Sequence, residues 1–184
     1  MMKKLLAYLV VALYGVSLAH AQLKPILKIS VDREQKTQRE VRQKAKVQTS
    51  GDVEYHTPEV ADSTRAVVLA IKIQNTSGVG LKGATVKYAV FGKDLTGSKV
   101  TLAVQGKTNV DLPALQKAQI QTDPANFESE EVKFRTGQFM ERNRQSGQKY
   151  YGVAVAVYNG TERLAVYYEP DGAEQAVAKS KIDF

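Results

Sequence analysis

The sequence contains no cysteine, which excludes several kinds of chemistry. Thiol catalysis, zinc sites with cysteine ligands and iron–sulfur clusters all require cysteine sulfur. Disulfide bonds are excluded as well, so an exported domain of this sequence would depend on core burial alone for its stability. That requirement favours a fold with a sizeable apolar core over a small disulfide-linked scaffold.

Histidine is nearly absent and tryptophan wholly so. Only His56 remains once the apolar leader, which contains His20, is set aside. A catalytic triad needs a base beside a nucleophile and a third group that orients the base. His56 lies in a polar stretch that we interpret as an exposed loop. The lack of tryptophan weakens a sugar-stacking role, and no phosphate loop, EF-hand or nucleophile elbow occurs. We expect no enzyme, no metal and no cofactor.

Carboxylates are the remaining candidates for catalysis. Glu128, Glu130 and Glu131 lie close together just before Val132. A paired-carboxylate hydrolase needs two acidic groups about 5 to 10 Å apart across a groove, and nothing in the sequence places them so. We interpret the three glutamates as a solvated strand edge and keep a hydrolase only as a third hypothesis.

One long apolar run is present, and it lies at the N-terminus. Lys3 and Lys4 precede apolar residues 5–18, and Ala19-His20-Ala21 offers small residues at the positions that a signal peptidase recognises. The run is shorter than the roughly 20 apolar residues of a membrane span. We therefore expect residues 1–21 to be a cleaved, bacterial-type signal peptide. The mature chain would be exported to the periplasm, the cell surface or the medium, with no integral membrane segment.

The formal charge is +7, and removing the two lysines of the leader leaves a modest +5. Basic residues gather early in the mature chain and form a candidate basic edge patch. Its members are Arg33, Lys36, Arg39, Arg42, Lys44 and Lys46. The patch could attract an acidic glycan, an anionic lipid or an acidic protein face. We favour the alternative of an edge strand whose charges block edge-to-edge pairing. Export and the lack of aromatic residues in this run argue against nucleic acid.

Alternation of apolar and polar residues with period two predicts short strands along most of the chain. The clearest examples are residues 27–31, 67–73, 84–90 and 100–104, and weaker ones carry Ile120 and Phe134. The strongest pair, residues 151–157 and 164–168, flanks Asn159-Gly160, which predicts a hairpin with a type I′ turn.

This spacing of strands, with no convincing helix between them, predicts an all-β antiparallel immunoglobulin-like β-sandwich of about seven strands. We expect one mature domain in three parts. An N-terminal strand and a polar, basic edge segment, with an edge strand and a long loop, occupy residues 22–63. The main β-sandwich occupies residues 64–171. A C-terminal tail, residues 172–184, forms a short helical turn or frays.

Tyrosines gather in the last hairpin. Alternation places Tyr151 and Tyr168 with the large apolar residues of the core and puts Tyr150, Tyr158 and Tyr167 on the opposite face. Tyrosines on an open sheet face are typical of protein interfaces and can also stack on sugars. Ordinary cross-strand aromatic pairing is the structural alternative. We take the last three as candidate protein or glycan contacts.

Two stretches carry a family resemblance. The first is Val68–Asn75 followed by Val86–Gly92, and the second is Lys149–Gly160 closing with Tyr168-Glu-Pro170. Over roughly residues 64–170 the chain resembles small exported bacterial immunoglobulin-like β-sandwich proteins. They include a type associated with type IV pilus gene clusters and similar to archaeal flagellar stator-type sandwich proteins.

The resemblance implies a non-enzymatic interaction or structural domain of the cell envelope or surface, with an accessory or subunit of a type IV pilus-like assembly among its roles. The partners would be envelope or surface proteins, and the chain itself in a homo-oligomer. The alternative is a carbohydrate-binding module that uses the exposed tyrosines.

Overall fold

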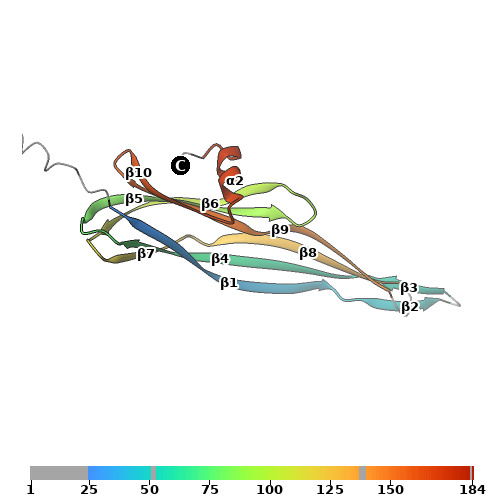
Figure 1. Ribbon diagram of the computed structural model, residues 1–184. Coiled ribbons are helices and arrows are strands. Elements are labelled where there is room, and N and C mark those ends of the chain that lie inside the picture. The colour runs from blue at the N-terminus through green and yellow to red at the C-terminus, as the bar shows by residue number, and fades with distance from the viewer. Residues whose placement is uncertain (1–24, 51–52, 137–139, 183) are drawn as a thin grey trace, which may run out of the picture.

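The computed structural model describes residues 25–50, 53–136, 140–182 and 184 (Figure 1). The predicted signal peptide, residues 1–21, lies outside them. Among the helices of the described residues, none has the length and apolar character that crossing a membrane requires.

The described chain is built almost entirely of strands. They are β1 (Leu27–Gln43), β2 (Lys46–Ser50), β3 (Val53–Thr57), β4 (Glu59–Asn75), β5 (Leu81–Asp94), β6 (Val100–Leu112), β7 (Lys117–Gln121), β8 (Ala125–Thr136), β9 (Met140–Asn159) and β10 (Glu162–Glu169). One helix, α2 (Ala173–Lys179), follows them within the predicted C-terminal tail. Strands β1 and β4 have 17 residues each and β9 has 20, so all three are far longer than the usual strand of about five or six residues.

Eight strands form one antiparallel sheet that folds over into two packed layers. The first layer contains β1, β4, β7, β8 and the first part of β9, and the second contains β10, the rest of β9, β5 and β6. Strand β9 belongs to both layers because it pairs with β8 up to Gly147 and with β5 from Gln148 onwards. The predicted all-β antiparallel sandwich is confirmed; among the described residues it has eight strands rather than about seven, and β2 and β3 form a separate hairpin.

The core lies between the two layers, where the predicted alternation holds. Leu69 and Ile71 of β4 face Val86 of β5 and Val155 of β9 in one cluster of fully buried side chains. Burying an aliphatic side chain of this size contributes about 1.5 to 3 kcal/mol each. The interior of this cluster therefore supplies the stability that a chain without disulfides requires.

Helix α2 covers the outer face of the second layer. Its Ala176 and Val177 pack against Ala89, Phe91 and Ala154 in a second apolar cluster. The short alanine side chains on the strands leave room for the helix to approach the sheet closely. Strand β9 is consequently buried on both faces over residues 153–157, which explains why its sequence is apolar at every position there.

Strands β9 and β10 form the predicted hairpin, but the turn differs from the prediction. Asn159 pairs with Glu162, so the loop consists of Gly160 and Thr161. Gly160 has a φ of 58°, whereas Asn159 is not among the residues with positive φ. A type I′ turn centred on Asn159-Gly160 would need positive φ at both residues, so that detail of the prediction is wrong.

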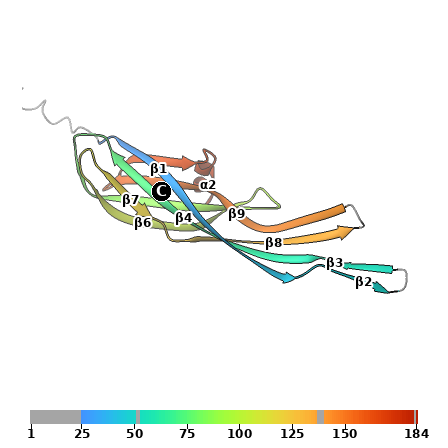
Figure 2. The same cartoon turned by 90° about the horizontal axis from the view of Figure 1, so that it is seen from below.

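Four strands continue past the sandwich as a long projection (Figures 1 and 2). We call this projection the arm; it consists of residues 35–43, 59–66, 126–136 and 140–147 of β1, β4, β8 and β9, with the β2–β3 hairpin beyond. Among the described strands β1 pairs with β4 alone and therefore lies at the edge of its layer. The expected long loop is instead the β2–β3 hairpin.

Candidate protein-interaction surface

The arm is a four-stranded sheet with two distinct faces. Paired residues on neighbouring strands place their side chains on the same face. Ala61 and its partner Glu131 lie on the face that continues the sandwich interior, which we call the core-side face. Val60 pairs with Val132, which pairs with Arg144, and these lie on the opposite face, the outer face. Beyond Phe127, whose ring is buried in the main core, no second layer of strands covers either face of the described part of the arm (Figure 2).

Ion pairs cover the core-side face. One nitrogen of the Arg39 guanidinium lies 3.1 Å from a carboxylate oxygen of Glu59 and 3.3 Å from one of Glu131. Lys133 adds a looser contact, 3.7 Å, to the same Glu131 carboxylate. Ala61, which lies opposite Glu131, is only 1% exposed. Long charged side chains thus shield the arm where apolar residues are lacking.

A second set of ion pairs lies on the outer face. Arg42 contacts Asp62 and Glu130, each at 2.5 Å, and so links β1 to β4 and β8. Strand β8 lies between β4 and β9, so the interpretation of Glu128, Glu130 and Glu131 as a strand edge is wrong. Two of these glutamates bind arginines across the sheet, an arrangement that serves the structure and does not resemble a pair of facing acids.

Large apolar side chains are nevertheless exposed on the arm. Val41 is 39% exposed, Val47 57% and Phe134 39%. Phe134 lies directly across from Arg142, and both line a shallow hollow of about 690 Å³ near the end of β8. Exposed apolar groups beside arginines are typical of surfaces that bind another protein.

The six residues of the predicted basic patch do not form one surface. Arg39 and Arg42 are paired with carboxylates on opposite faces of the arm. Lys36 pairs with Ala66 on the outer face, and Lys44 and Lys46 lie at the junction with the β2–β3 hairpin. Arg33 belongs to a different group of residues at the base of the arm. His56, which we expected in a loop, is exposed on β3 opposite Val47.

Arg33 contacts one of the predicted tyrosines. Its guanidinium carbon lies 5.0 Å from the centre of the Tyr150 ring, and that ring meets Phe127 edge-on at 6.2 Å. The hydroxyl of Tyr167 donates a hydrogen bond of 2.9 Å to Glu169. Sequence analysis therefore named Arg33, Tyr150 and Tyr167 as candidate contact residues, but it did not predict the contacts that they make.

Tyr150 lies against the main core and Tyr151 against the cluster under α2, so their faces are the reverse of those predicted. The cause is a β-bulge. Phe91 pairs with Gly152 and Gly92 with Tyr150, which leaves Tyr151 as an extra residue. An extra residue inverts the alternation on one side of the bulge.

A second irregularity, between Arg163 and Ala165, has the same effect on β10. Tyr167 consequently packs against the main core and Tyr168 against the cluster under α2. Tyr158 alone lies where the alternation placed it, with the Lys87 ammonium 5.1 Å from the centre of its ring. The three predicted contact tyrosines thus do not share a face, and they form no common platform for a sugar.

Burial raises the pKa of Tyr150 to about 12, with a further increase from the nearby charge of Glu169 and an opposing effect of Arg33. The pKa of Tyr167 is also raised to about 12, by desolvation first and then by its hydrogen bond to Glu169. Both phenols are therefore neutral at physiological pH. Through its contacts with Arg33 of β1 and Phe127 of β8, Tyr150 links the second part of β9 to the first layer.

No protein-family model and no curated protein matches this sequence. Two solved structures resemble it distantly. One is the X-ray structure of Northeast Structural Genomics Consortium target SoR45, with 15% identity, a TM-score of 0.28, and coverage of 67% of this chain and 84% of the other. The second is a crystal structure from Akkermansia muciniphila, with 13% identity, a TM-score of 0.30, and coverage of 88% and 83%. At such low identity and TM-score, neither structure indicates what this chain binds.

Proposed function

We propose that this chain is an exported, non-enzymatic interaction domain of the cell envelope or surface, and that the arm is its contact surface. The observation that carries the proposal is the arm itself. It extends the long strands well past the core-forming cluster, and its exposed apolar residues, Val41, Val47 and Phe134, contribute nothing to that core. A projection that adds surface without adding core is suited to contact with another molecule.

The edges of the arm support the same role. Along the arm, the described residues of β1 pair only with β4 and those of the first part of β9 only with β8, so each of these two strands has one unpaired backbone edge in the described structure. An open edge accepts an added strand from a partner, and charged side chains such as Lys36 and Arg144 limit indiscriminate pairing. The arm thus combines a surface for binding with protection against aggregation.

The carboxylates that motivated a hydrolase hypothesis have a structural role here. Glu130 and Glu131 neutralise arginines of β1 across the sheet. The sandwich itself is filled by apolar side chains. These contacts favour binding over catalysis as the role of this surface. Association with a type IV pilus-like assembly, which the sequence resemblance implies, is the finer form of the proposal.

The absence of native cysteine allows a direct test by site-specific cross-linking. A photo-activated cross-linker would be attached to Val47→Cys on the arm, and to Arg163→Cys on β10 of the sandwich as the control. In envelope preparations from the bacterium that carries the gene, we expect Val47→Cys to give a covalent product with an envelope protein and Arg163→Cys to give little. Pilus subunits among the products, identified by mass spectrometry, would support the finer proposal. Equal labelling from both positions, or none, would contradict the proposal.

A further inference from the structure

The outer face of the arm carries opposite charges at its two ends. Toward the sandwich it carries four carboxylates against two cations, Lys36 and Arg42, and toward the free end it is basic with an exposed phenyl ring. We propose that this face binds a second copy of the same chain, with the two arms packed antiparallel around a two-fold axis. The inference deepens the proposed function by naming one partner of the arm.

Four carboxylates form the acidic end. Glu40, Asp62, Glu128 and Glu130 line a hollow of about 460 Å³ on the outer face. Among the described side chains, Arg42 forms ion pairs with Asp62 and Glu130 but not with Glu40 or Glu128. Within the described part of the chain, neither Glu40 nor Glu128 has a cationic side chain at ion-pair distance. The hollow therefore keeps excess negative charge.

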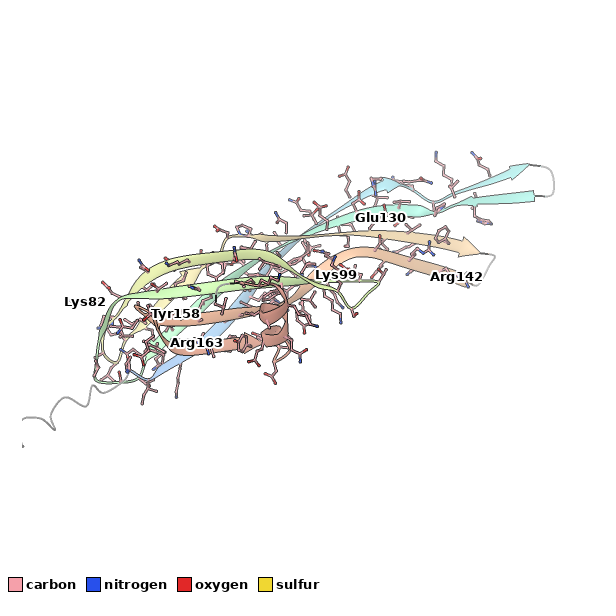
Figure 3. All side chains as sticks on the ribbon, turned by 90° about the horizontal axis from the view of Figure 1, so that it is seen from above. Lys82, Lys99, Glu130, Arg142, Tyr158 and Arg163 are labelled. Carbon is pink, nitrogen blue, oxygen red and sulfur yellow. The ribbon has the colours of Figure 1, made fainter. Side chains whose placement is uncertain are left out.

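The basic end lies further along the same face. Arg142 pairs with Phe134, and Arg144 with Val132, so all four side chains share the outer face. Neither arginine has an ion-pair partner among the residues that the structure describes. Figure 3 shows the arrangement, with Arg142 close to the free end of the arm and Glu130 nearer the sandwich. Two unpaired cations thus flank an exposed aromatic ring.

The spacing suits an antiparallel pair. Glu128 and Phe134 are six residues apart on β8, which is about 20 Å along a strand. If a second arm lies antiparallel on the first with the axis near position 131 of β8, the Phe134 end of each copy meets the Glu128 end of the other. Both contacts are identical, as a two-fold interface requires. A parallel pair would instead place like charges together.

The same charges disfavour other occupants. A polyanion attracted by Arg142 and Arg144 would be repelled by Glu40 and Glu128, and a polycation would meet the reverse problem. A partner surface with a basic end and an acidic end in the opposite order would place opposite charges together at both ends. The arm of a second copy of this chain presents such a surface. The complementarity therefore favours a second copy over a glycan or a simple acidic peptide.

The size of the face sets the expected strength. Four strands about 4.8 Å apart give a width of about 19 Å, and roughly nine residue rows give a length of about 30 Å. The two copies together would bury about 1,100 Å², at the low end of specific interfaces. We expect a reversible dimer with a dissociation constant in the micromolar range, weakened by salt because charge contributes to it.

Charge exchange gives the decisive experiment. In the acidic variant Arg142→Glu is combined with Arg144→Glu, and in the basic variant Glu40→Arg is combined with Glu128→Arg. Each variant alone places like charges at both contacts of the pair, so its dissociation constant should rise at least about tenfold. An equal mixture of the two should dimerise as the wild type does, because every contact is again between opposite charges. Sedimentation velocity across the micromolar range measures all three samples.

A matched control is Lys99→Glu with Arg163→Glu, which makes the same change in net charge on the sandwich (Figure 3). It should dimerise as the wild type does, and circular dichroism should show every variant folded. A wild type that stays monomeric across this range would overturn the inference, and so would a mixture that fails to associate. A monomer that binds a polyanion through Arg142 would replace it with a different occupant. The envelope cross-link from Val47 is independent of these results, so either idea can fail alone.

Discussion

Gly147 lies against the backbone of Glu128, at the point where β9 leaves the first layer of the sandwich for the second. A Cβ atom on this glycine would be 2.3 Å from the Glu128 carbonyl oxygen, and its φ of 105° is one that L-residues rarely adopt. Only glycine fits, because both the dihedral angle and the close backbone contact exclude a side chain. This residue therefore fixes the place where the arm joins the sandwich.

We expect Gly147→Ala to lower the free energy of unfolding by at least about 2 kcal/mol, since the strained dihedral alone costs about 1 to 3 kcal/mol. Urea denaturation followed by circular dichroism measures the loss. Gly78→Ala is the matched control, because Gly78 has nothing within 4 Å of the added carbon and no positive φ. A loss at Gly147 no larger than at Gly78 would show that the junction tolerates a side chain.

Removing the ion pairs of the core-side face should loosen the arm locally and change the overall free energy of unfolding little. Arg39→Gln removes both the Glu59 and the Glu131 contact. Exposed ion pairs contribute about 0 to 1 kcal/mol, so the overall free energy of unfolding should change by no more than about 1 kcal/mol. Amide hydrogen exchange should accelerate in the arm, at residues 59–63 and 128–133, and stay unchanged in β5.

Lys36→Gln is the control for this experiment, because Lys36 lies on the outer face of the same strand and forms no ion pair with any described residue. It should leave exchange in the arm unaltered. Faster exchange throughout the sandwich after Arg39→Gln would mean that the arm and the sandwich unfold as one unit.

The tyrosines at the base of the arm predict how stability depends on alkaline pH. In the unfolded chain a tyrosine loses its proton near pH 10.0, whereas Tyr150 and Tyr167 in the folded protein hold theirs to about 12. Between these values, proton loss favours the unfolded state, so the free energy of unfolding should fall as the pH rises through this window. Tyr150→Phe and Tyr167→Phe should each make the fall smaller.

The measurement is urea denaturation at several pH values, with tyrosinate absorbance recorded alongside. Comparison of each variant with the wild type near pH 8, where both phenols are neutral, isolates the effect of losing the hydroxyl group itself. A wild type and a Tyr150→Phe variant with parallel stability profiles above pH 10 would contradict the assigned burial of this ring.

The fold class could be predicted from the sequence because the sandwich has one apolar face per strand. Ile71 and Ile73 alternate with the polar Lys72 and Gln74 for that reason, and a covered second face makes residues 153–157 apolar throughout. The faces of Tyr150 and Tyr167 could not be predicted, since each depends on a bulge that shifts the register by one residue. A bulge leaves no periodic trace in a single strand.

The arm was harder to predict for a related reason. Where β1 runs along the arm, no second layer covers it in the described structure, so Arg39 and Arg42 form ion pairs on opposite faces and the strand shows no apolar period. Sequence analysis did identify the basic residues. It missed the pairing of Arg42 with Asp62 and Glu130. These residues are 20 and 88 positions from Arg42 in the sequence, and contacts over such separations leave no local signal. The dipolar outer face likewise depends on register, which only the folded sheet reveals.

Asn75 illustrates a polar residue whose burial the turn-like sequence around it did not indicate. It is fully buried, and its amide nitrogen lies 2.7 Å from the carbonyl oxygen of Val79, 3.1 Å from that of Leu112 and 3.2 Å from that of Pro113. Its side-chain oxygen accepts hydrogen bonds from the backbone and hydroxyl of Ser77. One side chain thus joins the ends of β4 and β6.

We expect Asn75→Asp to lower the free energy of unfolding at neutral pH by about 3 kcal/mol or more, because a buried carboxylate would face three carbonyl oxygens with no proton to donate. Asn75→Ala removes the same bonds without adding charge and should cost less, about 1 to 3 kcal/mol. Lowering the pH protonates the new carboxyl group, which can then donate one hydrogen bond, so the difference between the two variants should narrow in acid. Urea denaturation at neutral and acidic pH measures both losses. If the two variants were equally stable at every pH, the buried amide would not be donating to these carbonyl groups, and the two strand ends would have to be joined by other contacts.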